Sequence, residues 1–419
     1  MSDFHSLLST FRAATGADDD GPPRSSKGAK QDTDAASDGR KPARSLLEAT
    51  TELWRIAEIR RSTGISAARS AKHQQPPASS SRPAFHLAIC ACIVEDLPHE
   101  DVWRAFICGG GGRTGEGAAP PTETGAELYV HAKHPSRIRS RWVRSRTLDR
   151  SYRPDWNDVR VVRAMLALLA EALGDARTTH VLFCTESCLP VASLEEVARV
   201  VVGGEDDDLF YPQRSFVDMY GRGSPRATRF DERGCWDALQ DAVPLDAVRK
   251  ALPGWCLLSR RHARGVLDLP DRLGGQDLWP AFERVWAPEE VYFPTCLALL
   301  GFTSADEVVR RPLTYAEWNE RAKNHSDRAH PLTFDVSFDA RLVRYVREEQ
   351  GCLFLRKVKR SISVRRWEDS VDRARDRRWV CEDRAGKKRR RDNGDGGVDP
   401  QQEGSSSTST TSRNIRHRL

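Results

Sequence analysis

The stretch His180–Val191, HVLFCTESCLPV, decides how the rest of the chain is interpreted. Its apolar run stops abruptly at Thr185-Glu186-Ser187-Cys188. A buried strand of a parallel sheet ends in this way, with polar side chains at the rim of the sheet. Ligands of open α/β sheets bind at the carboxyl ends of the strands, so these four residues lie where a functional site is expected.

Short apolar runs alternate with amphipathic stretches on both sides of this strand. Residues 157–173 carry apolar side chains three and four positions apart, which predicts a helix. Ser193 and Glu196 predict a capping box that begins a helix running to about residue 202. The alternation predicts an α/β fold, with a mostly parallel central sheet and helices on both faces. Further strands are expected at 86–94, 126–131, 208–211 and 255–259. Further helices are expected at 260–268, at 277–286 and from Pro288 onward. Pro294 is expected to kink or interrupt the last of these helices.

Composition divides the 419 residues into three parts. Residues 1–84 are rich in Asp, Ser, Gly, Lys and Pro outside an apolar patch at Leu46–Ile59, and we interpret them as largely disordered. Residues 85–350 form a single large domain. Residues 351–419 are a basic, largely disordered tail.

The net charge of +6 does not by itself indicate a nucleic-acid partner. Much of the positive charge lies in the tail, where Lys387–Arg391 resembles a nuclear localisation or polyanion-binding run. Such runs are frequent in disordered tails, so a specific nucleic-acid role is disfavoured. No window approaches the roughly 18 apolar residues of a membrane span, and the N-terminus lacks a signal-peptide pattern. The ten cysteines are too sparse for a disulfide scaffold and include no C-x-x-C pair, although pairing in an oxidising compartment stays open.

A collinear set of short blocks covers about residues 86–345. Together these blocks resemble the successive motifs of the core-2/I-branching enzyme family, glycosyltransferase family 14, and most of all its plant and algal branch. The blocks are YVHAK at 129–133, FCTESCLP at 183–190, WCLLSR at 255–260, PEEVYFPT at 288–295, RPLTYAEW at 311–318 and HPLTF at 330–334.

The resemblance implies a GT-A-like nucleotide-sugar fold that inverts the anomeric centre without a divalent metal or other cofactor. The donor would be a UDP-sugar, with N-acetylglucosamine as the default, although relatives of the same fold use xylose or glucuronic acid. The acceptor would be a hydroxyl of a glycan or glycoprotein. Most GT-A enzymes hold a metal with Asp-x-Asp, whereas the strand at 180–184 ends in Thr-Glu-Ser-Cys. We interpret Asp206-Asp207-Asp208 as a solvated acidic turn rather than a metal site.

The same resemblance assigns roles to residues on the donor side. Glu290 matches the family's catalytic base, whereas Glu289 is interpreted as an ordinary carboxylate at a helix start. Arg311 matches the arginine that contacts the diphosphate, because charge on the leaving group must be neutralised. A second basic residue is expected near Thr333, where none stands, although Lys323 and Arg328 lie close in sequence.

The remaining donor and acceptor assignments are less regular. Val130 and Lys133 would lie near the nucleoside, and Lys133 stands where the family often has an Asp. A lysine cannot accept a hydrogen bond from a ribose hydroxyl or uracil N–H, which bears on donor preference. The residues expected along the acceptor are Glu186, Asp218, Arg222 and Arg226, and Trp255 and Trp318 either stack on a sugar or belong to the core.

Two alternatives remain open at this stage. One is a non-catalytic descendant of the fold that binds a glycan or a nucleotide, and the other is a nuclear polyanion-binding protein that uses the basic tail. Family members usually sit in the Golgi membrane behind an N-terminal anchor. The resemblance therefore predicts the Golgi membrane as the location. Either an incomplete N-terminus or a soluble protein would explain why this sequence shows no anchor.

Overall fold

The computed structural model describes residues 44–62, 85–109, 124–203, 213–227, 234–251, 255–318, 331–334, 338–358 and 361–375. The chain separates into two units after Ser45. Only Arg44 and Ser45 of the first unit are described, so the fold reported below is that of the second unit, Leu46–Leu419. The predicted strand at 208–211 and the run Lys387–Arg391 lie outside the described residues.

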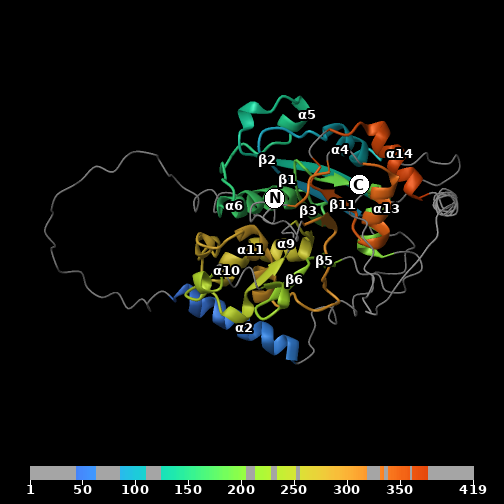
Figure 1. The fold of residues 1–419 in the computed structure, drawn as a ribbon. Coiled ribbons are helices and arrows are strands. Elements are labelled where there is room, and N and C mark those ends of the chain that lie inside the picture. Colours follow the sequence, from blue (N-terminus) through green and yellow to red (C-terminus); the bar gives the residue numbers. More distant parts are fainter. Residues whose placement is uncertain are drawn as a thin grey trace, which may run out of the picture. The chain divides into compact units, whose positions relative to one another are not determined.

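A six-stranded sheet forms the centre of this unit (Figure 1). Its strands, in spatial order, are β2 (Thr124–Ala132), β1 (Phe85–Ile93), β3 (His180–Thr185), β8 (Leu257–Ser259), β5 (Ser215–Phe216) and β9 (Val308–Val309). β1 pairs in parallel with β2 and β3, and β5 with β9, whereas β8 is antiparallel to both of its neighbours. The sheet is therefore mostly parallel, as the alternation of strands and helices predicts.

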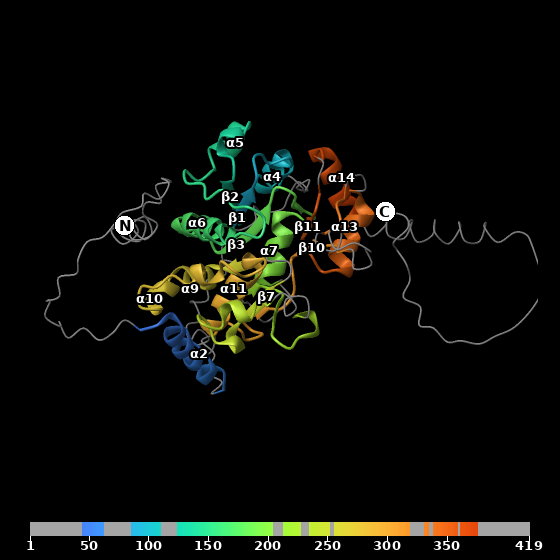
Figure 2. The ribbon, with the colours of Figure 1, turned by 60° about the vertical axis from the view of Figure 1, so that its left-hand side comes forward.

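Helices cover both faces of the sheet, which confirms that prediction (Figures 1 and 2). On one face, Leu87 and Ile89 of β1 join a buried cluster with α4 (Glu100–Ile107) and α7 (Leu194–Val202). On the other face, α6 (Arg160–Gly174) accepts a hydrogen bond from Cys90 Sγ, and the ring of Phe183 lies 5.0 Å from that of Phe293 in α11 (Pro288–Leu299). Successive residues of β1 and β3 thus point to opposite faces, both of them buried.

A second, smaller sheet lies beside the carboxyl end of β3. β11 (Phe354–Arg356) pairs in parallel with β10 (Thr314–Ala316) and antiparallel with β4 (Leu189–Pro190). Beyond β11, the amide of Val358 donates to the carbonyl oxygen of Ser187 at 2.9 Å. Residues 356–358 therefore run alongside the polar turn that follows β3. A further hairpin pairs β6 (Met219–Gly221) with β7 (Arg249–Ala251).

The folded part continues past the predicted boundary at residue 350, so that boundary is wrong. β11 lies beyond it, and so does the helix α14 (Val364–Arg375), which packs on α13 (Ala340–Arg344). Trp367 of α14 is fully buried, and its indole N–H donates to the Pro190 carbonyl at 2.8 Å. α14 is rich in charge, but it buries Trp367, Val371 and Ala374 along one stripe, which composition alone does not reveal.

The apolar patch in the N-terminal region forms the helix α2 (Leu46–Ser62), which packs against α11. Trp54 and Ala57 are buried there, and Thr50 Oγ1 donates to the Ala242 carbonyl at 2.8 Å. The helix extends three residues past the patch, to Ser62. The rest of residues 1–84, apart from Arg44 and Ser45, lies outside the described residues.

One local prediction about helices is wrong, one is confirmed, and of the kink or interruption expected at Pro294 the interruption does not occur. The stretch 277–286 forms only a short 3-10 turn, Trp279–Phe282, because buried Leu278, Phe282 and Val285 anchor it as irregular chain. α11 runs through Pro294 without interruption, since burial of that face offsets the one backbone hydrogen bond that proline cannot donate. The capping box of α7 forms in both directions, between Ser193 and Glu196. The other helices are α5 (Arg141–Arg144), α9 (Arg260–Leu267) and α10 (Leu269–Arg272).

The described residues also bear on membranes and on disulfides. None of the helices in the described ranges combines the length and the apolar character needed to cross a bilayer. Nine of the ten cysteines fall within these ranges, and all nine are free thiols.

Candidate functional site

The predicted site residues follow strands that end at one edge of the large sheet. Lys133 follows β2 and Glu186 follows β3, and these strands run parallel to β1 between them. Asp218 and Arg311 follow β5 and β9, which reach the same edge because β8 reverses direction between β3 and β5. With neighbouring strands about 4.8 Å apart, the row from β2 to β9 is roughly 24 Å long. The residues therefore form an extended edge rather than one contact point.

In the turn after β3, the side chains of Thr185, Ser187 and Cys188 bond to the turn itself, and only that of Glu186 is left to contact a ligand. Thr185 Oγ1 lies 3.0 Å from Ser187 Oγ, and the Thr185 amide donates to Cys188 Sγ at 3.4 Å. These three polar groups therefore satisfy one another and hold the turn. Glu186 is half-buried, and burial raises the pKa of its carboxyl, an effect that the positive charges of Arg356 and Lys357 oppose.

Arg356 is a site residue that the sequence analysis missed. Its guanidinium lies 5.1 Å from the ring centre of Trp255. Burial raises the pKa values of Glu186, Glu289 and Cys188, and the charge of Arg356 opposes that rise. Its Nε atom is buried and has no hydrogen-bond partner among the described residues. Arg356 is thus a basic residue at this edge that the motif blocks do not include. The apolar run Leu353–Leu355 that ends in Arg356-Lys357 repeats the strand-end pattern of the 180–191 stretch and could have identified it.

Glu290 stands in the first turn of α11 and forms an ion pair with Lys250 of β7. The side chains are 13% and 4% exposed, so this pair is almost completely removed from solvent. α11 begins after Ala287, which has a left-handed backbone and donates its amide to Asn157 Oδ1. The segment before α6 thereby helps to fix the start of the helix that carries the predicted base.

Glu289 does not behave as the ordinary helix-start carboxylate of the sequence interpretation. Its Oε2 atom is buried without a hydrogen-bond partner among the described residues. Burial, together with the charge of Glu290, raises the pKa of the Glu289 carboxyl to about 7, against the opposing effect of Lys250 and Arg356. Glu289 also acts on the pKa of Cys92 at the end of β1, so it faces the sheet edge rather than open solvent.

The far end of the row holds Arg311, Asp218 and Arg226. Arg311 Nη1 donates to the Gly351 carbonyl at 2.5 Å, and its guanidinium lies 5.4 Å from the ring of Phe216. Arg226 binds both oxygens of Asp218, at 2.8 and 2.5 Å. This bidentate pair orders the start of the predicted acceptor loop. Arg222, on the same loop, is exposed.

The near end of the row differs from the nucleoside site expected at Val130 and Lys133. Val130 is fully buried in the core, its amide donates to the Arg146 carbonyl and its own carbonyl accepts from Leu148. Lys133 Nζ donates to Asp155 Oδ1 at 2.6 Å, and this bond lowers the pKa of Asp155. The Val130 side chain thus faces the core, while the lysine ammonium already has an acidic partner.

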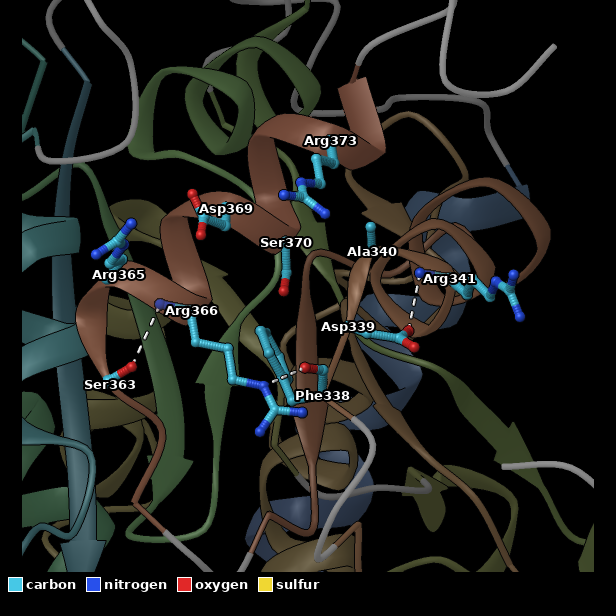
Figure 3. A pocket seen from close by; sticks show the side chains of 10 residues that line it. All are labelled: Phe338, Asp339, Ala340, Arg341, Ser363, Arg365, Arg366, Asp369, Ser370 and Arg373. Atoms are coloured by element: carbon cyan, nitrogen blue, oxygen red, sulfur yellow. Dashed lines mark hydrogen bonds between the residues drawn. The ribbon is translucent and has the colours of Figure 1, made fainter. Parts of the chain in front are cut away.

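A depression of about 500 Å³ between α13 and α14 is a separate feature (Figure 3). None of the predicted site residues lines it. Its charged lining comes from Arg341, Arg365, Arg366, Arg373, Asp339 and Asp369. Opposite charges are therefore interspersed there.

No group of three or more His, Cys, Asp or Glu side chains suited to hold a metal occurs within the ranges that the structure covers. The acidic run Asp206-Asp207-Asp208 lies outside those ranges. At the described edge, Arg356 and Lys357 lie near Glu186, and Arg311 follows β9 farther along the row. These cations are of the type suited to a phosphate-bearing ligand.

The comparisons with known proteins identify the family of this chain. The family model of the core-2/I-branching enzymes matches residues 127–341, slightly more than half of the chain. The chain therefore belongs to the core-2/I-branching enzyme family, and its α/β fold with a mostly parallel central sheet is that of a GT-A-like domain.

One curated relative is the rice protein named Glycosyltransferase BC10, from Oryza sativa subsp. japonica. It is 25% identical over a match of 268 residues, and the match covers 58% of this chain and 60% of the relative. The chain thus spans about three fifths of that relative's length.

Proposed function

We propose that this protein is an inverting glycosyltransferase that moves a sugar from a UDP-sugar to a hydroxyl of a glycan or glycoprotein, without a metal ion. Family membership and the name of the rice relative support the transferase class. The observation that carries the proposal is the placement of Arg356, half-buried beside Glu186 and Glu289 at the sheet edge, with an unpartnered Nε atom. A half-buried guanidinium with one buried N–H that lacks a hydrogen-bond partner is suited to an anionic ligand.

The proposed reaction gives one role to the base, which acts on the acceptor hydroxyl, and another to the cations, which act on the diphosphate of the donor. Glu290 takes the proton of the acceptor hydroxyl, whose oxygen attacks the anomeric carbon from the face opposite UDP. The bond from that carbon to the phosphate oxygen breaks, and its electron pair leaves with UDP. Arg356, Lys357 and Arg311 neutralise the charge that develops on the diphosphate, which is the task a divalent cation performs in metal-dependent enzymes.

Donor sugar, cofactor requirement and location are further parts of the proposal. N-acetylglucosamine is the proposed sugar, on the family alone. The Golgi membrane is the proposed location on the same ground. The acceptor contacts are proposed for Glu186, Asp218, Arg222 and Arg226, since Glu186 and Asp218 share one edge with Arg311 and the loop of Arg222 begins at that edge.

The first experiment measures UDP release from a panel of UDP-sugars with mixed glycan acceptors, in the presence of EDTA. Wild type is compared with Glu290→Gln, which keeps the shape of the side chain and removes the base. We expect EDTA-resistant release that falls by at least roughly 100-fold in the variant, the usual contribution of general base catalysis. The donor that supports release identifies the sugar.

A second arm measures UDP binding by calorimetry. Arg356→Gln is expected to weaken binding roughly 10-fold or more, because a hydrogen bond between charged groups contributes about 1.5–3 kcal/mol. Arg177→Gln is the matched control, since Arg177 is an exposed arginine just before β3, at the opposite edge of the sheet. UDP binding without release from any donor would instead favour a non-catalytic binding protein. Release abolished by EDTA and restored by a divalent cation would contradict metal independence.

A further inference from the structure

Lys250 is the closest charged neighbour of the proposed base, and neither the family motifs nor the reaction above uses it. Its ammonium donates to Glu290 Oε2, and only 4% of its side chain is exposed. Lysine is almost never buried unless it is paired. The Lys250–Glu290 pair is therefore not an ordinary surface ion pair, and its burial beside the proposed base needs an explanation.

Three contacts fix where the Lys250 ammonium lies. β7 pairs with β6 at Tyr220↔Lys250. The neighbouring residue Arg249 receives a hydrogen bond from Thr295 Oγ1 at its carbonyl and donates its amide to the same oxygen, at 3.2 and 3.0 Å. These bonds dock β7 on α11, the helix that carries Glu290. The ammonium also lies 5.0 Å from the ring of Trp286, which closes its other side.

The charges around this pair come from several elements. On α11 itself, Glu289 is the adjacent carboxyl, and its pKa is raised by burial and by Glu290 and lowered by Lys250 and Arg356. Two carboxyl groups and one buried ammonium thus share a site with little solvent. Glu289 in turn interacts electrostatically with Cys92 of β1 and Arg356 of β11, and Arg356 interacts with Glu186 after β3. The guanidinium of Arg249, next to Lys250 in β7, points away from the pair, toward the Asp246 carbonyl and Trp54.

We propose that Lys250 is a positioning residue for Glu290, which orients the base and sets the pH range in which transfer occurs. This inference rests on the proposed function. Removal of one partner of a buried ion pair leaves the other as an uncompensated charge. Without Lys250, the Glu289 and Glu290 pair takes up a proton at higher pH, and a protonated carboxyl cannot accept the proton of the acceptor hydroxyl.

The test compares Lys250→Met, which keeps much of the side-chain volume, with Lys250→Arg, which keeps the charge. Arg261→Met is the matched control, because it breaks a partly buried ion pair with Glu307 that touches none of the site residues. The kcat, the donor KM and the thermal midpoint of unfolding are measured from about pH 5 to pH 9, the range in which catalytic carboxyls and amines are usually tuned.

We expect Lys250→Met to lower kcat roughly 10- to 100-fold near neutral pH while the donor KM changes less than about 3-fold, as for loss of an interaction made in the transition state. The acid limb of its pH–rate profile moves to higher pH. Lys250→Arg recovers most of kcat, and Arg261→Met keeps the wild-type profile. A Lys250→Met enzyme with a lower unfolding midpoint but an unchanged pH profile would show a purely structural ion pair and overturn the proposal.

A readout independent of turnover separates this inference from the proposed function. Diazo reagents esterify protonated carboxyls, and peptide mapping by mass spectrometry reports the pH at which Glu289 and Glu290 are half-labelled. That pH rises in Lys250→Met if the proposal is right. If wild type releases no UDP from any donor, the proposed function fails, whereas an unchanged labelling profile overturns the role of Lys250.

Discussion

Glu289 and Glu290 are adjacent in the chain, but their carboxyl groups have different surroundings. Glu290 is held by a buried ammonium, whereas Glu289 has a buried oxygen with no partner in the described structure. Pairs of carboxyls with unequal surroundings are typical of sites where one group carries a proton and the other does not. The one-residue step along α11 is enough to turn the two side chains toward β7 and toward the sheet edge.

Replacement of Glu289 by Gln is expected to change how stability depends on pH. The pKa of this carboxyl rises from 4.5 to about 7 on folding, so the folded state holds the proton more tightly. The associated stability is fully present below about pH 4.5 and is lost as pH rises through about 7. Glu289→Gln removes this loss, and we expect it to stabilise the protein by about 1–3 kcal/mol at pH 8 with little effect at pH 4.5.

Urea denaturation at the two pH values measures this difference. Glu171→Gln, an exposed carboxylate on α6, is the matched control and should leave the pH dependence unchanged. Equal effects of Glu289→Gln at both pH values would contradict the assignment.

At the scale of elements, α11 is the helix on which the site depends. β7 docks on it through Thr295 and brings Lys250, while α2 covers another part of it. Trp54 of α2 is 9% exposed, and its ring lies 4.5 Å from the guanidinium of Arg61 and 5.6 Å from that of Arg249. Thus α2, β7 and α11 form one packed group, although α2 lies almost two hundred residues before β7 in the chain.

Trp54→Ala is therefore expected to destabilise the protein by about 3 kcal/mol, the usual cost of deleting a buried aromatic side chain. Trp156→Ala is the control, because Trp156 is 68% exposed and a surface substitution usually changes stability by less than about 0.5 kcal/mol. The midpoints of thermal unfolding of the two variants, compared with wild type, measure this difference in stability. Similar midpoints for both would show that α2 contributes little to the fold.

At the scale of the whole molecule, the C-terminal elements complete both the core and the site. β11 supplies Arg356 and pairs with β4 and β10, and α14 inserts Trp367 against Pro190. Glu196 of α7 binds Arg375 at 2.6 Å and also pairs with Arg347, which ties this region to the capping box. The segment from 351 to 375 is therefore an integral part of the domain.

A chain that ends at Gln350 is expected to lose cooperative unfolding, because β4 and β10 lose their partner strand and the Trp367 site is left empty. A chain that ends at Arg378 retains all described elements and should unfold with the wild-type midpoint. Circular dichroism during thermal unfolding compares the two. A cooperative transition in the shorter chain would show that β11 and α14 are dispensable for folding.

Local patterns predicted the strands β1, β2, β3 and β8 and the principal helices, whereas the short strands β5 and β9 were not predicted. The periodicity of 157–173 and the capping box at Ser193 are signals within a few residues of one another, and both elements form. The 277–286 stretch fails because its apolar residues fill gaps in the core as irregular chain, a choice that depends on the neighbouring elements. α14 was missed for the opposite reason, since its overall polarity hides a narrow buried stripe.

The sequence by itself determined the α/β class, the collinear family motifs and the polar rim after β3, because these depend on residue type and spacing along the chain. Only the tertiary structure decided which charges meet at that rim. Arg356 follows Arg311 by 45 positions, and Lys250 precedes Glu290 by 40. Strand pairing of β11 with β4 and docking of β7 on α11 bring these charges to the rim. Contacts over such separations are set by packing and burial, for which no local pattern exists.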